Sequence, residues 1–310
     1  MRRAMMLCVA ACLAGAASVA SQTGDVDRVL GEARQALGGG EKLAAVKTLA
    51  ATGHRVRIED DKPTSATDTE IVFELPDRFM RRDVVLRMES GVVTHRLGFY
   101  GGAPINVFEQ PAEITGSFQF RASTDAPADQ TPEQQTQALV RAARQDFSRF
   151  ALGMLLPPLP AYPLEFSYGG PAEPAEGKAD IIDVRGEGGF AVRLFIDTRT
   201  HLPLMLSWMA KEPPQRTGSA QRFNGEPTPR QREQMQKESA QRRKEAMANL
   251  RVVEYRQIYG DYRNVDAVMV PFGLQRTIDG KRTEQVTFDD VKINGKINPK
   301  KFDTKQSMRP

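Results

Sequence analysis

The chain has 310 residues, 43 of them basic and 39 acidic, which gives a net charge of +4. This near balance excludes the strongly basic surface of a nucleic-acid-binding protein, so no nucleic-acid partner is expected. The length is enough to bury a large core, either in one domain with insertions or in two small ones.

The first twenty residues have the pattern of a secretory signal. Arg2 and Arg3 precede an apolar stretch over residues 4–17, and residues 17–20 (ASVA) supply small side chains for cleavage near Ala20. The stretch is shorter than the ~20 apolar residues of a membrane span, and no later segment approaches that length. We therefore predict an exported, periplasmic protein without a transmembrane span in its mature part.

Residues 9–12 (VAAC) allow an alternative, because they loosely resemble a lipobox that would anchor the chain through an acylated Cys12. Few apolar residues precede that cysteine, which favours cleavage near Ala20. Cys8 and Cys12 are the two cysteines of the chain, so the mature protein would have no disulfide and no thiolate metal site.

The N-terminal third predicts two helices followed by strands. Apolar residues recur at helical spacing over residues 25–37, and a short helix over 41–48 leads into a strand near Ala50. Runs rich in β-branched and aromatic residues, separated by turn residues, then predict an antiparallel meander. Its strands are expected at residues 52–59, 70–75, 78–88, 92–100 and 105–108.

A polar insertion near residues 109–130 precedes a strong helix signal. Thr131, Pro132 and Gln134 form the sequence pattern of a capping box with proline at the first helical position. The apolar stretch that follows, residues 147–159 (FSRFALGMLLPPL), fits either a core helix with a buried exit or a lid over an apolar pocket. Methionine and leucine suit a lid because they adapt to varied ligands.

The second half predicts seven more strands, interrupted by an insertion near residues 210–249. They are expected at residues 164–168, 179–185, 190–197, 202–209, 251–259, 268–279 and 284–293. Residues 210–230 are rich in turn formers, and residues 231–249 are predicted to be a solvated helix with i,i+4 ion pairs, or a contact for anionic lipid or an acidic partner. Gly260 and Asp261 are predicted to form a hairpin turn.

About a dozen strands without strand–helix–strand alternation indicate a mainly β protein with helices, of the α+β class. The sheet is antiparallel, and it must curve or close to bury one face and protect its edges.

The sequence offers no catalytic, cofactor or metal constellation. His54, His95 and His201 are far apart and match no ligand pattern, and no nucleophile elbow or phosphate-binding loop occurs. No catalytic residue, cofactor or metal is therefore predicted, and the protein is not expected to be an enzyme.

Several segments, taken in order, resemble the outer-membrane lipoprotein-sorting (LolA/LolB-like) family. They are residues 33–53 (ARQALGGGEKLAAVKTLAATG), 74–81 (ELPDRFMR), 195–203 (FIDTRTHLP), 264–271 (NVDAVMVP) and 286–294 (VTFDDVKIN). The resemblance implies a single domain over residues 21–310, in which a curved antiparallel sheet forms an incomplete β-barrel plugged by α-helices. It also implies an apolar cavity that carries lipid or an acylated lipoprotein across the periplasm. No individual binding residue is carried over from the family.

Two functions follow as hypotheses. The first is a periplasmic carrier of lipid or lipoprotein, and the alternative is a structural or regulatory envelope module that binds another envelope protein. An apolar interior can hold an acyl chain without catalytic groups, because each buried methylene contributes about 0.8 kcal/mol. We expect the cavity to be lined by Phe73, Phe79, Phe147, Phe150, Met154, Leu155, Phe166, Leu194, Leu206, Trp208 and Phe272.

Overall fold

A computed structural model describes residues 13–89, 91–110, 131–212 and 250–304, together with Glu238, Gln241 and Glu245. The insertions predicted near 109–130 and 210–249 fall almost entirely outside these residues. So do the first twelve residues, including Cys12.

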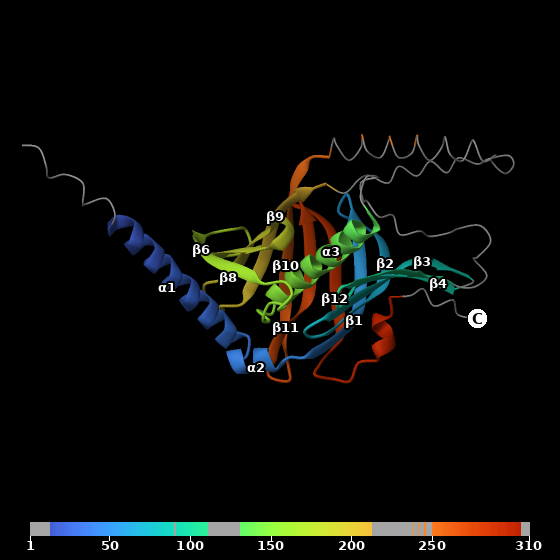
Figure 1. The fold of residues 1–310 in the computed structure, drawn as a ribbon, viewed down its shortest axis with the longest axis horizontal. Helices are drawn as coiled ribbons and strands as arrows, with labels where there is room; N and C mark the ends of the chain where they lie inside the picture. Colours follow the sequence, from blue (N-terminus) through green and yellow to red (C-terminus); the bar gives the residue numbers. More distant parts are fainter. Residues whose placement is uncertain are drawn as a thin grey trace, which may run out of the picture.

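Twelve antiparallel strands form one sheet, which confirms the predicted fold class (Figure 1). In chain order they are β1 (Thr48–Glu59), β2 (Lys62–Glu74), β3 (Arg78–Met88), β4 (Gly91–Tyr100), β5 (Ala103–Glu109), β6 (Leu164–Ala172), β7 (Ala179–Gly186), β8 (Phe190–Asp197), β9 (Pro203–Lys211), β10 (Val252–Val265), β11 (Val268–Ile278) and β12 (Lys281–Ile293).

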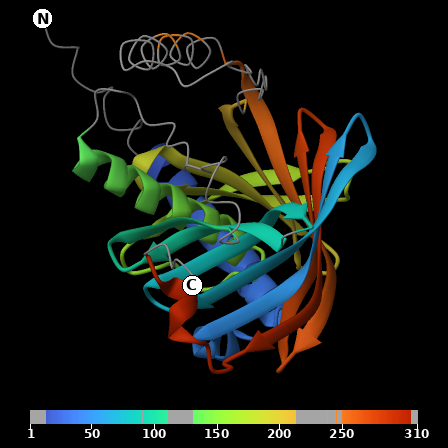
Figure 2. The ribbon, with the colours of Figure 1, turned by 90° about the vertical axis from the view of Figure 1, so that its right-hand side faces the viewer.

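The sheet consists of two meanders that meet in its middle. β1 to β5 run outward to one edge, β12 back to β6 run outward to the other, and β1 pairs with β12 at the seam. β5 and β6 are therefore the two edges and do not pair with each other, so the sheet is an incomplete barrel (Figure 2). A side chain at Gly53, beside the register shift between β1 and β12, would lie 2.0 Å from the carbonyl oxygen of Thr287. Only glycine permits this close approach.

Two long helices lie against the sheet. α1 (Leu13–Ala36) is followed by the short α2 (Gly40–Ala45) and packs against the edge strand β6. α3 (Pro132–Leu152) belongs to the connection between the two edges and lies across the concave side (Figures 1 and 2). Within the described ranges there are also two 3-10 turns, η2 (Glu187–Gly189) and η3 (Pro299–Phe302).

The start of α3 confirms the predicted cap. The Thr131 hydroxyl accepts a hydrogen bond from the Gln134 backbone N–H at 3.3 Å, and the Gln134 side chain accepts one from the Thr131 N–H at 2.9 Å. These reciprocal bonds satisfy backbone donors that the first helical turn leaves free.

Several predicted boundaries differ from the structure, among them the start of α1 and the end of β10. α1 begins at Leu13 instead of residue 25, because the alanine-rich segment around Ala20 favours helix and nothing interrupts it. The turn predicted at Gly260 and Asp261 is wrong, since β10 continues to Val265. Asp261 instead has a positive φ of 51°, and the register of β10 and β11 is the same on both sides of it, since Gly260 pairs with Gly273 and Tyr262 with Pro271.

Candidate functional site

The concave face of the sheet has two halves, and α3 fills the first. The ring of Phe147 makes edge-on contacts with Phe73, Phe79 and Phe99, at centroid distances of 5.4, 5.5 and 6.3 Å. All four side chains are almost completely buried. The helix therefore occupies this half as part of the core.

The segment after α3 is buried as deeply as the helix. Met154, Leu155, Leu156 and Leu159 are each 5% exposed or less. Leu155 has a φ of +46°, a conformation that is rare for a branched side chain. Residues 153–159 thus continue the plug that α3 begins.

Two tyrosines of β10 hold the end of α3. The Tyr259 hydroxyl donates a hydrogen bond to the Arg149 carbonyl at 2.5 Å, and the Tyr262 hydroxyl donates to the carbonyls of Gly153 and Pro203 at 2.7 and 2.9 Å. Burial raises the pKa of both phenols, so they stay neutral donors. The plug is attached to the sheet by side chains, with these hydroxyls as its main polar contacts near Gly153.

The structure brings the predicted apolar residues into one cluster. Nine are buried there, and the other two, Phe166 and Trp208, are partly buried against it. That these eleven residues line a ligand cavity remains a prediction. Of the two interpretations of residues 147–159, the described conformation is the packed one.

The second half of the concave face is polar, and the sequence analysis did not predict it. Arg55 Nε lies 2.6 Å from Glu284 Oε2, and Arg81 lies 3.1 Å from Asp83 and 3.5 Å from Glu284. Asp83 also accepts a hydrogen bond from the Thr69 hydroxyl at 2.7 Å. These side chains come from β1, β2, β3 and β12, and together they form a charge network that spans the seam between the two meanders.

The network holds its carboxylate in the ionised form. Burial opposes ionisation of Glu284, but the charges of Arg81, Arg276 and Arg55 outweigh it and lower the pKa of Glu284 to about 2. Burial also opposes the charge of Arg81, and the neighbouring carboxylates of Asp83 and Glu284 outweigh it and raise the pKa of Arg81. The buried ions are therefore matched with partners, as stable buried charges must be.

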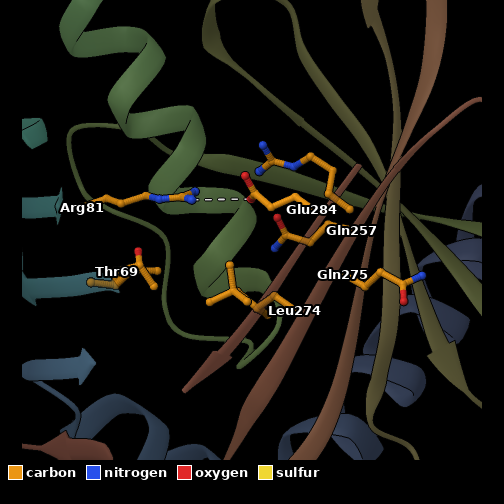
Figure 3. Close-up of a pocket in the computed structure, with 9 residues that line it drawn as sticks. Thr69, Arg81, Gln257, Leu274, Gln275 and Glu284 are labelled. Carbon is orange, nitrogen blue, oxygen red and sulfur yellow. Dashed lines mark hydrogen bonds and ion pairs between the residues drawn. The ribbon is translucent and has the colours of Figure 1, made fainter. Parts of the chain in front are cut away.

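A hollow lies where the polar and apolar halves meet (Figure 3). It holds about 310 Å³ of empty space, part of it open to solvent. The space within it that the centre of a water molecule can occupy is about 20 Å³, enough for about one water molecule. Its lining residues are Thr69, Ile71, Arg81, Gln257, Leu274, Gln275, Arg276, Glu284 and Val286. In this conformation the hollow thus has room for about one water-sized group, such as a single oxyanion oxygen, and not for a whole lipid.

The sequence did not predict the hollow because its charges are spread over four strands, β1, β3, β11 and β12. One local signal was present: Arg81 and Asp83 continue the inward-facing period of two that starts at Phe79. A charge at a position that the alternation assigns to the core indicates a buried ion pair or a site.

Within the described residues, no group of three or more metal-ligating side chains occurs, and no helix is long and apolar enough to cross a membrane. The three histidines lie apart. His54 is near Asp68 and Asp289, both at 3.2 Å, His201 is near Glu32 at 3.5 Å, and His95 contacts Asn106.

No protein-family model and no curated protein matches the sequence. Among solved structures, a domain assigned to outer membrane lipoprotein-sorting proteins from Vibrio parahaemolyticus matches with a TM-score of 0.48 and 9% identity, covering 90% of this chain and 96% of that one. A DUF1329 family protein from Desulfovibrio piger matches with a TM-score of 0.45 and 9% identity, covering 90% and 97%. A LolA superfamily protein from Nitrosomonas europaea matches with a TM-score of 0.44 and 9% identity, covering 87% and 97%. Two of these descriptions name the family that the sequence motifs resemble, but at these similarities they do not say what this chain binds.

Proposed function

We propose that this protein is an exported, periplasmic carrier of lipid or of acylated lipoprotein. The acyl chain would take the place of α3 and residues 153–159 on the apolar half of the concave face. The proposal rests on the helical plug that covers this apolar half. One amphipathic helix and its exit segment fill it, attached by side chains, in a barrel whose edges β5 and β6 stay apart.

Because only side chains attach the plug to the sheet, the plug could move away while the sheet stays folded. α3 has no backbone hydrogen bond to any strand among the described residues, whereas every strand has a backbone-paired neighbour. Displacing α3 would expose rings such as Phe73 and Phe79, and an acyl chain could then cover them at about 0.8 kcal/mol for each buried methylene.

The filled interior supports a second function, an envelope module that binds a protein partner and holds no lipid. In that case α3 would be a permanent part of the core. The two functions differ in one measurable property, which is whether the folded protein takes up an apolar ligand.

The direct test is purification from the periplasm without detergent, followed by mass spectrometry of extracted lipid. The carrier function predicts lipid at a fixed ratio to protein. An empty protein that also takes up no fluorescent fatty-acid analogue would exclude the carrier function and favour the protein-partner function.

A pair of tyrosine variants tests whether the plug moves. Tyr259→Phe combined with Tyr262→Phe removes the hydroxyls that hold the end of α3. Each lost hydrogen bond corresponds to about 1 kcal/mol, or about a fivefold change in the equilibrium between the filled and open states. Uptake of the fluorescent analogue should therefore become tighter, because the open state is more populated.

The matched control is Tyr255→Phe on the same strand, whose hydroxyl donates to the Lys211 carbonyl of β9 and not to α3. Its uptake should equal that of the unmodified protein. If the double variant is less stable but its folded fraction binds no more ligand, α3 is only a core helix. Replacing Phe150 or Met154 with Asp provides a further variant, in which a carrier would lose uptake.

A further inference from the structure

The charge network around the hollow contains one cation more than it has carboxylates. Arg55, Arg81 and Arg276 of the sheet face Asp83 and Glu284. From α3, Arg149 and Asp146 add one charge of each sign. Among the described residues, the network therefore has one positive charge in excess.

The excess charge can be assigned to Arg276. Arg55 and Arg81 each contact both Asp83 and Glu284, and Arg149 pairs with Asp146 at 2.9 Å. The Arg276 guanidinium, by contrast, forms no hydrogen bond or ion pair with a described residue, although its charge helps to lower the pKa of Glu284. Its Nε, like that of Arg149, is buried without an acceptor. A buried donor left without an acceptor costs about 1–3 kcal/mol, so its position at the hollow needs an explanation.

The surroundings of Arg276 combine a polar and an apolar wall. In the sheet it lies between Gln257 of β10 and Glu284 of β12, its direct register partners. Leu274 and Val286 line the same hollow from the neighbouring positions. Figure 3 shows Arg81, Glu284, Gln257 and Leu274 around this space, with α3 beside it. A ligand here would meet a guanidinium at one side and the apolar half of the concave face at the other.

We propose that Arg276 binds a single oxyanion, a phosphate or a carboxylate, and that this anion is the head group of an amphiphile whose tail lies on the apolar half. The planar guanidinium offers donors at the spacing of two oxyanion oxygens, and one negative charge neutralises the excess. The anion would also reduce the repulsion between Arg276 and Arg149. The tail rests on the proposed carrier function, whereas the anion contact rests on Arg276 and the hollow.

Binding of three probes separates these parts. The probes are dodecyl phosphate and dodecyl maltoside, both below their micelle concentrations, and inorganic phosphate, measured by calorimetry and by the fluorescence of Trp208. This is the single tryptophan of the chain, and the guanidinium of Arg149 lies 4.7 Å from its ring centre. The unmodified protein should bind dodecyl phosphate about tenfold or more tightly than dodecyl maltoside, as expected for hydrogen bonds to a charged group.

Two variants assign the preference to Arg276. Arg276→Gln should abolish the preference for the anionic amphiphile, and Arg276→Lys should retain part of it. Arg256→Gln is the matched control, since Arg256 lies on β10 one position from Gln257 and on the opposite face of the sheet. The control should keep the full preference.

The outcomes distinguish this inference from the proposed function. Equal binding of both amphiphiles, unaffected by Arg276→Gln, overturns the head-group site and leaves the carrier function standing. Binding of inorganic phosphate alone, lost in Arg276→Gln, supports the anion site but contradicts the tail and the carrier function. Binding of none of the three probes overturns both.

Discussion

The two halves of the concave face are built from the same strands and yet are completed in different ways. On β2 the inward side chains change from Phe73 to Thr69, and on β3 they change from Phe79 through Arg81 to Asp83. Where they are apolar, α3 supplies matching rings and leaves no space. Where they are polar, the strands pair their own charges and leave a hollow.

The difference indicates what each half can do. A helix can close an apolar surface because rings pack without strict direction, whereas a charge network closes only if every donor finds an acceptor. The Nε atoms of Arg276 and Arg149 are buried donors for which the described residues provide no acceptor. The apolar half thus stabilises the fold, and the polar half retains unmet interactions.

The largest expected effect is in the apolar half. Phe147→Ala removes the ring that contacts Phe73, Phe79 and Phe99 and leaves a cavity, so the free energy of unfolding should fall by about 3–5 kcal/mol. Urea denaturation measures the change. Met209→Ala, at a side chain that is 63% exposed, should change it by less than about 0.5 kcal/mol. A small loss at Phe147 would mean that α3 is not firmly packed on the sheet.

A somewhat smaller loss is expected in the polar half. Glu284→Gln leaves Arg55 and Arg81 facing an uncharged amide, and the unfolding free energy should fall by about 2–3 kcal/mol. A double-mutant cycle with Arg81→Gln measures the coupling. Additive losses would show that the two groups do not interact in solution.

The carboxylate of Glu284 should also make the free energy of unfolding depend on pH. Because the pKa of Glu284 is held at about 2, below the ordinary value of 4.5, its contribution is complete above the ordinary value and is lost as the pH falls towards about 2. Urea midpoints between pH ~5 and ~2 should therefore fall less steeply in Glu284→Gln than in the unmodified protein. Glu41→Gln, at an exposed position of α2, should keep the steep dependence.

The smallest effect is expected at Arg276. Arg276→Gln removes a charge that repels Arg149 but also helps to keep Glu284 ionised, so the two effects oppose each other and stability should change by less than about 1 kcal/mol. Arg256→Gln breaks an ion pair with Glu254 at 2.9 Å and should lower it by about 0–1 kcal/mol. Thermal unfolding of the two variants compares them directly. A clear loss in Arg276→Gln would show that Arg276 serves the fold.

The sequence predicted the elements better than the site, for a physical reason. Period-two alternation and turn residues are local signals. They predicted both ends of β3 and β8 correctly and most other strand ends within several residues. β2 is the exception, since it begins at Lys62 and not near residue 70. Its polar first half is paired with β1, and this pairing has no local signal.

The hollow depends on pairing that the sequence does not reveal. Arg55 and Glu284 are 229 positions apart and meet only because β1 and β12 are neighbours. Arg81 and Glu284 are 203 positions apart. The apolar residues, by contrast, could be grouped from sequence because any inward apolar side chain of this sheet reaches the same core.

The pairing of β1 with β12 also bears on the order in which the strands pair during folding. The Lys47 backbone N–H bonds the Asn294 side chain across 247 positions, so the middle of the sheet joins the two ends of the chain. Each meander can form from local hairpins, but β1 has no partner on this side until β12, the last strand, arrives. Contacts of such long range form slowly, and the unpaired strand is open to association with other chains meanwhile. We therefore expect the centre of the sheet to be its last part to assemble.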